Sequence, residues 1–223
     1  MAIKRSYSDA CSAAHALNLV GERWALLIVR ELLLGPKRFT DLKDGLPGVS
    51  PNVLTQRLNE LETTQVIKRR KLPLPVSAWV YELSDWGREL EPIILQLARW
   101  GVQSTRFTRP VGLGVDSMIL SLRAMFNPQA AQGYTTTVEI SLAEDQFVVR
   151  VTDSRIELIR GSIQQADARI QTDPDTLVML AYGKADLNQA IQTGKLALTG
   201  NKTAIERFLG LFSLPRQVYE EAS

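Results

Sequence analysis

One stretch of the sequence combines residue types and spacing that suit a chemical task. Between Ser50 and Thr63, leucines at 54, 58 and 61 recur at helical spacing, so one face of a helix is apolar. The opposite face carries uncharged groups that both donate and accept hydrogen bonds, namely Asn52, Thr55, Gln56 and Asn59. Such groups match the base edges of a DNA major groove, although a solvated helix face has a similar composition.

A run of cations follows this helix and favours the nucleic-acid interpretation. The run is Lys68-Arg69-Arg70-Lys71, and it would meet a phosphate backbone. Because side chains alternate along a strand, we expect about half of these cations to face DNA. The alternative is an edge strand protected from aggregation by its charges. Further phosphate contacts are expected from Lys37, Arg38, Thr40, Ser50 and Arg57.

The elements around this helix form a recognisable order. Helices are expected at 11–20, 22–34, 39–46 and 50–63, followed by strands at 66–72 and 78–83. Gly35-Pro36 ends the second helix, and Pro47-Gly48 provides a tight turn before the fourth. Two helices joined by such a turn and followed by a hairpin form a winged helix-turn-helix.

The last helix of this half is unusually apolar. Ser84 is expected to cap a helix of about 17 residues that ends near Gly101, with apolar positions at Leu90, Ile93, Ile94, Leu97 and Trp100. A helix of this kind needs a partner to cover it. We expect a homodimer formed through the N-terminal helices and the helix of residues 84–101.

The second half of the chain has a different pattern. Residues 105–115 form a predicted linker between a domain at 1–104 and another at 116–223. Strands are expected at 134–142, 146–152, 155–160, 168–172 and 195–199, and helices at 173–182, 186–192 and 201–211. This order predicts an α+β domain with an antiparallel sheet.

Composition restricts the class of protein. Hydrophobic residues make up 45% of the 223 residues and charged residues 22%, as in ordinary globular proteins. No apolar run is long enough to span a bilayer and no leader is apparent, so we expect a cytoplasmic protein without membrane insertion. Residues 1–110 hold 16 Lys and Arg against 11 Asp and Glu, a net of +5, whereas residues 111–223 hold 10 against 13, a net of −3.

The residues that usually perform catalysis or bind metals are scarce. With one cysteine, Cys11, and one histidine, His15, a zinc site is not expected. No nucleophile motif or phosphate-binding glycine loop occurs, so neither an enzyme nor a cofactor is predicted. We expect His15 to be packed. Cys11 is either packed or a redox sensor, since a nearby helix N-terminus lowers the pKa of a thiol.

The N-terminal half resembles a known family. Residues 11–101 are similar to the HxlR-type winged-helix transcriptional regulators, relatives of the MarR group, most specifically through Ser50-Pro51-Asn52-Val53-Leu54-Thr55-Gln56-Arg57-Leu58. The resemblance implies a homodimer on pseudo-palindromic double-stranded DNA, with each recognition helix in a major groove. Members usually carry Cys-Pro near the N-terminus, whereas Cys11 is followed by Ser12.

The C-terminal half resembles the later part of the sterol carrier protein type 2 fold. The similarity runs through residues 168–177 and Gly194-Lys195-Leu196 to Phe208. It implies a hollow domain that holds a lipid-like molecule. Apolar side chains would line such a pocket, and we expect them to be Met118, Leu122, Met125, Phe126, Leu177, Leu180, Tyr182 and Phe208. A filled core would use the same residue types.

Two functional hypotheses follow from the sequence. The first is a dimeric transcriptional regulator whose DNA affinity changes when an apolar effector binds the C-terminal domain. The second is a lipid-binding or carrier protein whose N-terminal half serves mainly for dimerisation. A filled C-terminal dimerisation module without a ligand is a third possibility.

Overall fold

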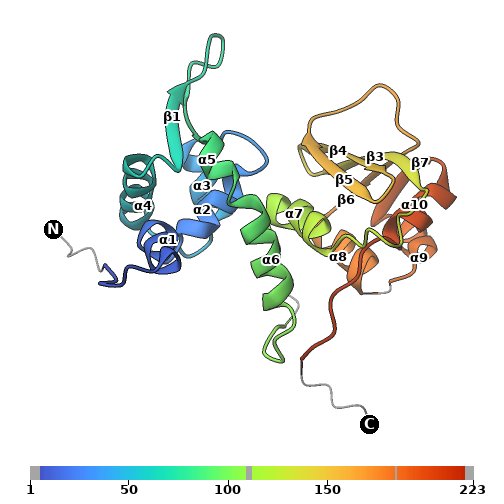
Figure 1. Cartoon of the computed structure of the whole chain (residues 1–223). Helices are drawn as coiled ribbons and strands as arrows, with labels where there is room; N and C mark the ends of the chain where they lie inside the picture. The colour runs from blue at the N-terminus through green and yellow to red at the C-terminus, as the bar shows by residue number, and fades with distance from the viewer. Residues whose placement is uncertain (1–5, 109–111, 184, 219–223) are drawn as a thin grey trace. The chain divides into compact units, whose positions relative to one another are not determined.

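The computed structural model describes residues 6–108, 112–183 and 185–218 and contains two compact units (Figure 1). The first unit is Met1–Ile94 and the second is Leu95–Ser223, so the division falls inside a helix. None of the helices in the described ranges is both long and apolar enough to cross a membrane.

The first unit begins with four helices: α1 Ser12–Val20, α2 Ala25–Leu32, α3 Phe39–Gly45 and α4 Pro51–Thr63. The prediction that the second helix begins at residue 22 was wrong. Trp24 has φ 79, a left-handed conformation, and so it precedes the helix rather than belonging to it. The turn at 21–24 separates α1 from α2.

The predicted apolar face of α4 forms the centre of the first core. Leu54, Leu58 and Leu61 are at most 1% exposed and lie in one cluster with residues of α2 and α3, among them Ile28 and Leu42. Ser50 caps the helix by accepting a hydrogen bond from the Val53 amide at 3.3 Å, and Pro51 occupies the first turn. Burial of the leucine face therefore leaves the polar face of α4 towards solvent.

A β-hairpin follows α4 and forms the wing. Strand β1 (Ile67–Lys71) pairs antiparallel with β2 (Trp79–Leu83), and the loop at 72–78 lies at the far end of the hairpin (Figure 1). Lys37 extends this sheet by one bridge, because its amide donates to the Tyr81 carbonyl at 3.0 Å and its carbonyl accepts from the Tyr81 amide at 2.8 Å. The segment before α3 is thus tied to the wing.

The expected single helix from Ser84 to Gly101 is divided in two. The structure has α5 (Asp85–Arg88) and α6 (Glu91–Gly101), with a turn at residues 89–90. Pro92 explains the division, since proline has no amide hydrogen and its ring clashes with the carbonyl four residues earlier, here that of Arg88. Proline is tolerated in the first turn of α6 instead.

A buried ion pair connects α2 to the segment that begins α3. The Glu31 side chain is 2% exposed and meets the Arg30 guanidinium at 2.7 Å and Lys37 Nζ at 2.5 Å. Gly45 at the end of α3 lies so close that a Cβ atom there would overlap the Glu31 carboxylate. The carboxylate therefore has two cationic neighbours and no spare room.

The second unit is a five-stranded sheet with helices. The strands are β3 Thr135–Leu142, β4 Asp145–Thr152, β5 Arg155–Arg160, β6 Ala168–Thr172 and β7 Leu196–Gly200. The helices are α7 Val115–Met125, α8 Pro174–Tyr182, α9 Leu187–Gln192 and α10 Lys202–Leu209. The α+β class is confirmed, while α7 had not been predicted.

The sequence predicted an antiparallel sheet, and three of the four strand pairs are antiparallel. The strand order is β5-β4-β3-β6-β7, and β3 pairs with β6 in parallel. Residues 161–167 cross back after β5 and deliver β6 to the free edge of β3. Glu139 of β3 holds this crossover by accepting from the Ile163 amide at 2.9 Å, and Arg169 donates to the Gln164 carbonyl at 2.7 Å. The sheet is therefore mixed.

The contact between Gly45 and Glu31 generates a stability prediction. Gly45→Ala should lower the free energy of unfolding by about 1–2 kcal/mol, because displacing a buried, paired carboxylate outweighs the better helix propensity of alanine. Urea unfolding followed by tryptophan fluorescence measures the change. Gly101→Ala is the control, since nothing lies near its added Cβ. A Gly45→Ala protein as stable as the parent would contradict this account of Glu31.

Candidate nucleic-acid interface

The four predicted base-reading residues share the solvent-facing side of α4. Asn52, Thr55, Gln56 and Asn59 are all exposed. In the free chain the Thr55 hydroxyl donates to the Pro51 carbonyl at 2.9 Å, and Gln56 Nε2 donates to Glu60 at 3.0 Å. Both contacts lie within α4. Bound DNA would have to replace the hydrogen bond between Gln56 and Glu60, whereas Asn52 and Asn59 present their amides to solvent.

Two of the predicted phosphate contacts are occupied by carboxylates. The Arg57 side chain is 11% exposed, forms an ion pair with Glu60 and lies 3.8 Å from Glu22. Lys37 is 15% exposed and bound to Glu31. In the free chain both cations are mostly buried and paired with carboxylates, and their contact with phosphate stays a prediction.

The remaining contacts predicted near α3 and α4 are more accessible. The Arg38 side chain is 58% exposed and pairs with Asp41 at 2.9 Å, which accepts from the Arg38 amide as well. Burial alone would raise the pKa of Asp41, but the hydrogen bonds and charge of Arg38 hold that pKa below its usual value. Thr40 and Ser50 are exposed at the starts of α3 and α4, where amides favour anions.

The four cations of the wing lie on its two faces, two on each face. Lys68 and Arg70 share one face with Glu82, at 3.3 Å and 2.7 Å. Burial acts to raise the pKa of Glu82, but hydrogen bonds and charge from Arg70 and Lys68 outweigh it and the pKa is lowered. Glu82 is therefore ionised at neutral pH and neutralises part of the charge on this face.

The other face of the wing carries Arg69 and Lys71. The Arg69 guanidinium stacks over the Trp79 ring at 4.7 Å and lies 5.8 Å from the Tyr81 ring. Lys71 lies directly opposite Trp79 on the paired strand. Sequence reasoning had not singled out Trp79 or Glu82. Strand alternation could have found both, because each is fixed opposite a cation once the hairpin register is known.

His15 of α1 had been expected to be packed, and Cys11 before α1 to be either packed or a redox sensor. Cys11 and His15 are both exposed, so the packed interpretation of these side chains was wrong for the single chain. Cys11 precedes α1, and hydrogen bonds from the Ala14 and Ala13 amides lower the pKa of its thiol. Within the described ranges, no group of three or more His, Cys, Asp or Glu side chains could hold a metal ion.

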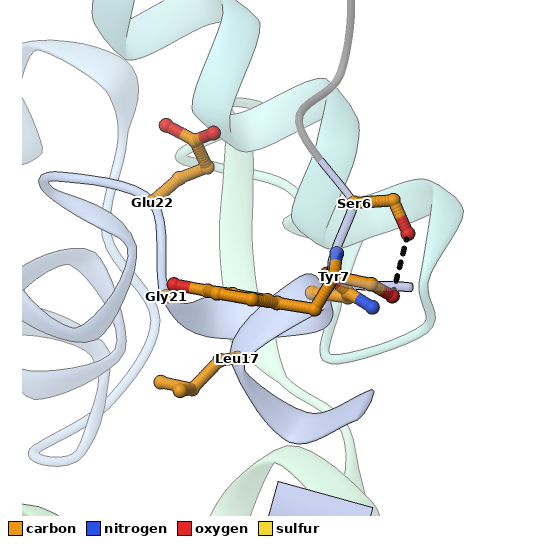
Figure 2. A pocket seen from close by; sticks show the side chains of 6 residues that line it. Ser6, Tyr7, Leu17, Gly21 and Glu22 are labelled. Atoms are coloured by element: carbon orange, nitrogen blue, oxygen red, sulfur yellow. Dashed lines mark hydrogen bonds between the residues drawn. The ribbon is translucent and has the colours of Figure 1, made fainter. Parts of the chain in front are cut away.

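Apolar side chains are exposed on α1 and α6. A pocket of about 280 Å³ beside α1 is lined by Ser6, Tyr7, Leu17, Asn18, Gly21 and Glu22 (Figure 2). Its lining includes Tyr7, 58% exposed, and Leu17, 47% exposed. On α6 the side chains of Ile93, Leu97 and Trp100 are 56%, 48% and 72% exposed and recur at helical spacing. We call these three residues the α6 stripe.

The residues expected to line an apolar pocket lie in the core of the second unit. Four of them, Met118, Leu122, Leu177 and Phe208, are 0% exposed. Met125 and Phe126 are also buried, and burial raises the pKa of Tyr182, whose hydroxyl lies 2.9 Å from that of Ser121. Leu180 lines a pocket of about 320 Å³ whose other lining residues lie on α8, on α9 and in the segments next to them, and are mostly polar or charged.

The first unit is a winged helix-turn-helix, a class of DNA-binding domain. Residues 19–108 match the family model of HxlR-like helix-turn-helix proteins. YvaP of Bacillus subtilis (strain 168), described as an uncharacterized HTH-type transcriptional regulator, is 38% identical over 88 residues, which are 40% of this chain and 82% of that protein. The similarly described YtcD is also 38% identical, over 44% of this chain and 76% of its own length. The chain belongs to the HxlR family and is a DNA-binding transcriptional regulator.

The second unit matches a different model. Residues 113–220 match the family model of the alkyl sulfatase C-terminal domain, which is sterol-carrier-like, and the α+β fold expected for this half is confirmed. A double mutant of the sec-alkyl sulfatase PisA1 has a TM-score of 0.42 and 23% identity, over 45% of this chain and 16% of that one.

The environment of Cys11 generates a pH prediction. Its thiolate should form at a lower pH than that of a free cysteine, because backbone amides stabilise the anion. Alkylation by iodoacetamide, followed by mass spectrometry across pH, gives the midpoint directly, since the sequence holds no other cysteine. An unstructured peptide of residues 6–16 is the control. Equal midpoints in protein and peptide would show that the helix start does not act on the thiol.

Proposed function

We propose that this regulator binds a two-fold symmetric DNA site as a homodimer and reads bases through α4. The observation that carries the proposal is the exposed, uncharged face of α4, followed directly by a wing with four cations. Asn52 and Gln56 can form bidentate hydrogen bonds with adenine, whereas Thr55 and Asn59 can contact other base edges. Arg38, Arg69 and Lys71 would contact phosphates.

The α6 stripe supports the homodimer. Three large apolar side chains on one helix face are exposed together, and such groups in a single chain usually mark an interface. The same face of a second α6 can pack against this one, because a two-fold interface is formed by the same surface of both subunits. Tyr7 and Leu17 at α1 add apolar surface that the partner can cover. A cytoplasmic location is part of the proposal, since the protein must reach chromosomal DNA.

For the second unit we propose binding of an apolar small molecule that changes DNA affinity. The match to the alkyl sulfatase C-terminal model supports this role. The pocket beside α8 has Met179 and Leu180 among mostly polar and charged lining side chains, so it would hold a ligand with both apolar and polar groups. Pockets of about 300–1,000 Å³ suit small ligands. The alternative, a lipid carrier that uses its N-terminal half only to dimerise, requires DNA binding to be indifferent to sequence.

Selection from a random pool of DNA duplexes tests the main proposal. The parent protein should enrich a two-fold symmetric motif with half-sites about one helical turn apart. Asn52→Ala and Gln56→Ala should each relax the preference at particular positions of the motif, at a cost of about 1–3 kcal/mol against the best site. Gln192→Ala, an exposed glutamine of α9, is the control and should leave the motif unchanged.

Each outcome of the selection separates the hypotheses. A motif without two-fold symmetry would contradict the homodimer. Uniformly weaker binding of all sequences by the α4 variants would contradict base reading by these side chains. If the parent protein enriches no motif and its binding disappears as salt rises, the carrier hypothesis is favoured instead.

Glu82 generates a prediction of tighter binding. Glu82→Gln should release Lys68 and Arg70 for phosphates, so DNA affinity should rise and the slope of log K against log salt should steepen by about 1 per new contact. Lys71→Gln should have the opposite effect. Glu89→Gln makes the same change of net charge outside the wing, and should do little. Titrations at several salt concentrations measure the slopes, and equal slopes for Glu82→Gln and the parent would refute this role.

A further inference from the structure

The pocket beside α1 combines an aromatic ring, an aliphatic side chain and a carboxylate. Its volume is about 280 Å³, and Tyr7, Leu17, Gly21 and Glu22 are among its lining residues. Figure 2 shows the Tyr7 ring reaching towards Gly21, with Leu17 and Glu22 on either side of it in this view. Among the lining residues that the structure describes, Glu22 is the one charged side chain, and it is 44% exposed. The pocket is therefore both apolar and negatively charged.

The carboxylate of Glu22 keeps room for a hydrogen-bond donor. It meets the Arg57 guanidinium at 3.8 Å, at the long end of the range for an ion pair. An ionised carboxylate only accepts hydrogen bonds and has about four positions for donors. By contrast, the Asn18 amide oxygen already accepts from the Tyr7 amide at 2.8 Å, which holds the segment before α1 against the helix. Glu22 is therefore the group in this pocket that can anchor a ligand by charge.

These features specify a small cation with an apolar body. A ring can lie between Tyr7 and Leu17, while an ammonium group donates to Glu22 and lies over the Tyr7 ring. An anion would be repelled by Glu22 and would meet no cation among the lining residues that the structure describes. Pockets for drug-sized ligands have volumes of about 300–1,000 Å³, so this smaller pocket suits one ring on a short chain.

We propose that this pocket binds a small amine, protonated and carrying one aromatic ring on a short alkyl chain, through Glu22 and Tyr7. Such an amine is charged at neutral pH, because its pKa resembles the value of about 10.4 for lysine. The pocket belongs to the first unit and is separate from the ligand site proposed for the second unit. In the proposed homodimer the partner must cover Tyr7 and Leu17 without filling the pocket.

Glu22 connects the pocket to α4. Its carboxylate faces Arg57, which also pairs with Glu60, and the other oxygen of Glu60 accepts from Gln56 Nε2 at 3.0 Å. An ammonium bound to Glu22 weakens the attraction between that carboxylate and Arg57 and adds a positive charge beside it. Both effects make the potential at α4 more positive, so the amine should tighten DNA binding, and DNA should tighten amine binding by the same factor. This coupling rests on the proposed function, whereas the pocket itself does not.

Three compounds of similar shape test the requirement for positive charge. Phenethylammonium, phenethyl alcohol and phenylacetate share a ring and a short chain but carry a positive, zero and negative charge. Isothermal titration calorimetry on the full chain without DNA should show that the ammonium binds about fivefold more tightly than the alcohol, as expected for a partly exposed ion pair with a cation–π contact. Phenylacetate should bind more weakly than both. Equal binding of the three compounds would overturn the site, and so would no binding, as when the partner subunit fills the pocket.

Glu22→Gln separates the carboxylate from the rest of the pocket. The variant should bind the ammonium and the alcohol with equal affinity, because the amide keeps the shape of the side chain and removes its charge. Glu22 is partly exposed, so the substitution leaves the core intact. Glu62→Gln makes the same change at an exposed residue of α4, and this control should keep the preference of the parent. A preference for the ammonium that survives in Glu22→Gln would overturn the role of Glu22.

The effect on DNA is measured with the operator from the selection experiment. Saturating phenethylammonium should raise the affinity of the parent about threefold, the range for one exposed charge pair, whereas phenethyl alcohol should not. Glu22→Gln should bind the operator with the raised affinity already, and the ammonium should add nothing. An unchanged affinity of the parent would overturn the coupling through Arg57. Failure of the parent to select any operator would overturn the proposed function, and calorimetry without DNA would still decide whether the pocket binds the amine.

Discussion

The arrangement of the DNA-binding unit depends on Lys37 and its two different bonds. Its ammonium group neutralises the buried Glu31 carboxylate of α2, and its backbone pairs with Tyr81 of the wing. Lys37 thereby connects α2, the segment before α3 and the hairpin. An unpaired carboxylate at this depth would cost several kcal/mol, so the pair restricts the alternatives open to the chain. With α3 and the wing fixed, the leucines of α4 can bury only in the orientation that exposes its amides.

Charge on the surface proposed to face DNA, around α4 and the wing, depends on carboxylates as much as on cations. Counting lysines and arginines near α4 overestimates the cations that are free of carboxylates, because Arg57 and Lys37 are mostly buried and each is paired with a carboxylate. Glu82 neutralises part of the charge of two more cations, Lys68 and Arg70, which are not buried. Some cations of this unit therefore stabilise the fold through ion pairs, and others remain available to a polyanion. The amino-acid composition does not distinguish the two groups.

The sequence predicted the parts of the fold that depend on local pattern. Leu54, Leu58 and Leu61 lie where their spacing placed them, and β6 has the predicted bounds, because alternation and caps act over a few residues. The failures involve longer-range or backbone effects. Pro92 was overlooked within an apolar repeat, and α7 was missed next to a glycine-rich linker. The parallel pairing of β3 with β6 depends on a crossover between strands about 30 residues apart, which no local pattern specifies.

The side chains of one α4 helix cannot supply the specificity that a regulator needs. Four short residues contact only a few base pairs, and each good contact contributes about 1–3 kcal/mol of discrimination, against ~10⁶–10⁹ competing sites in a genome. Two copies related by a two-fold axis double the number of bases read without adding residues to the helix. Contacts outside the major groove extend the site further. On this argument the homodimer proposed to form through the α6 stripe meets a requirement of specificity, since a small recognition helix needs a second copy to distinguish its operator.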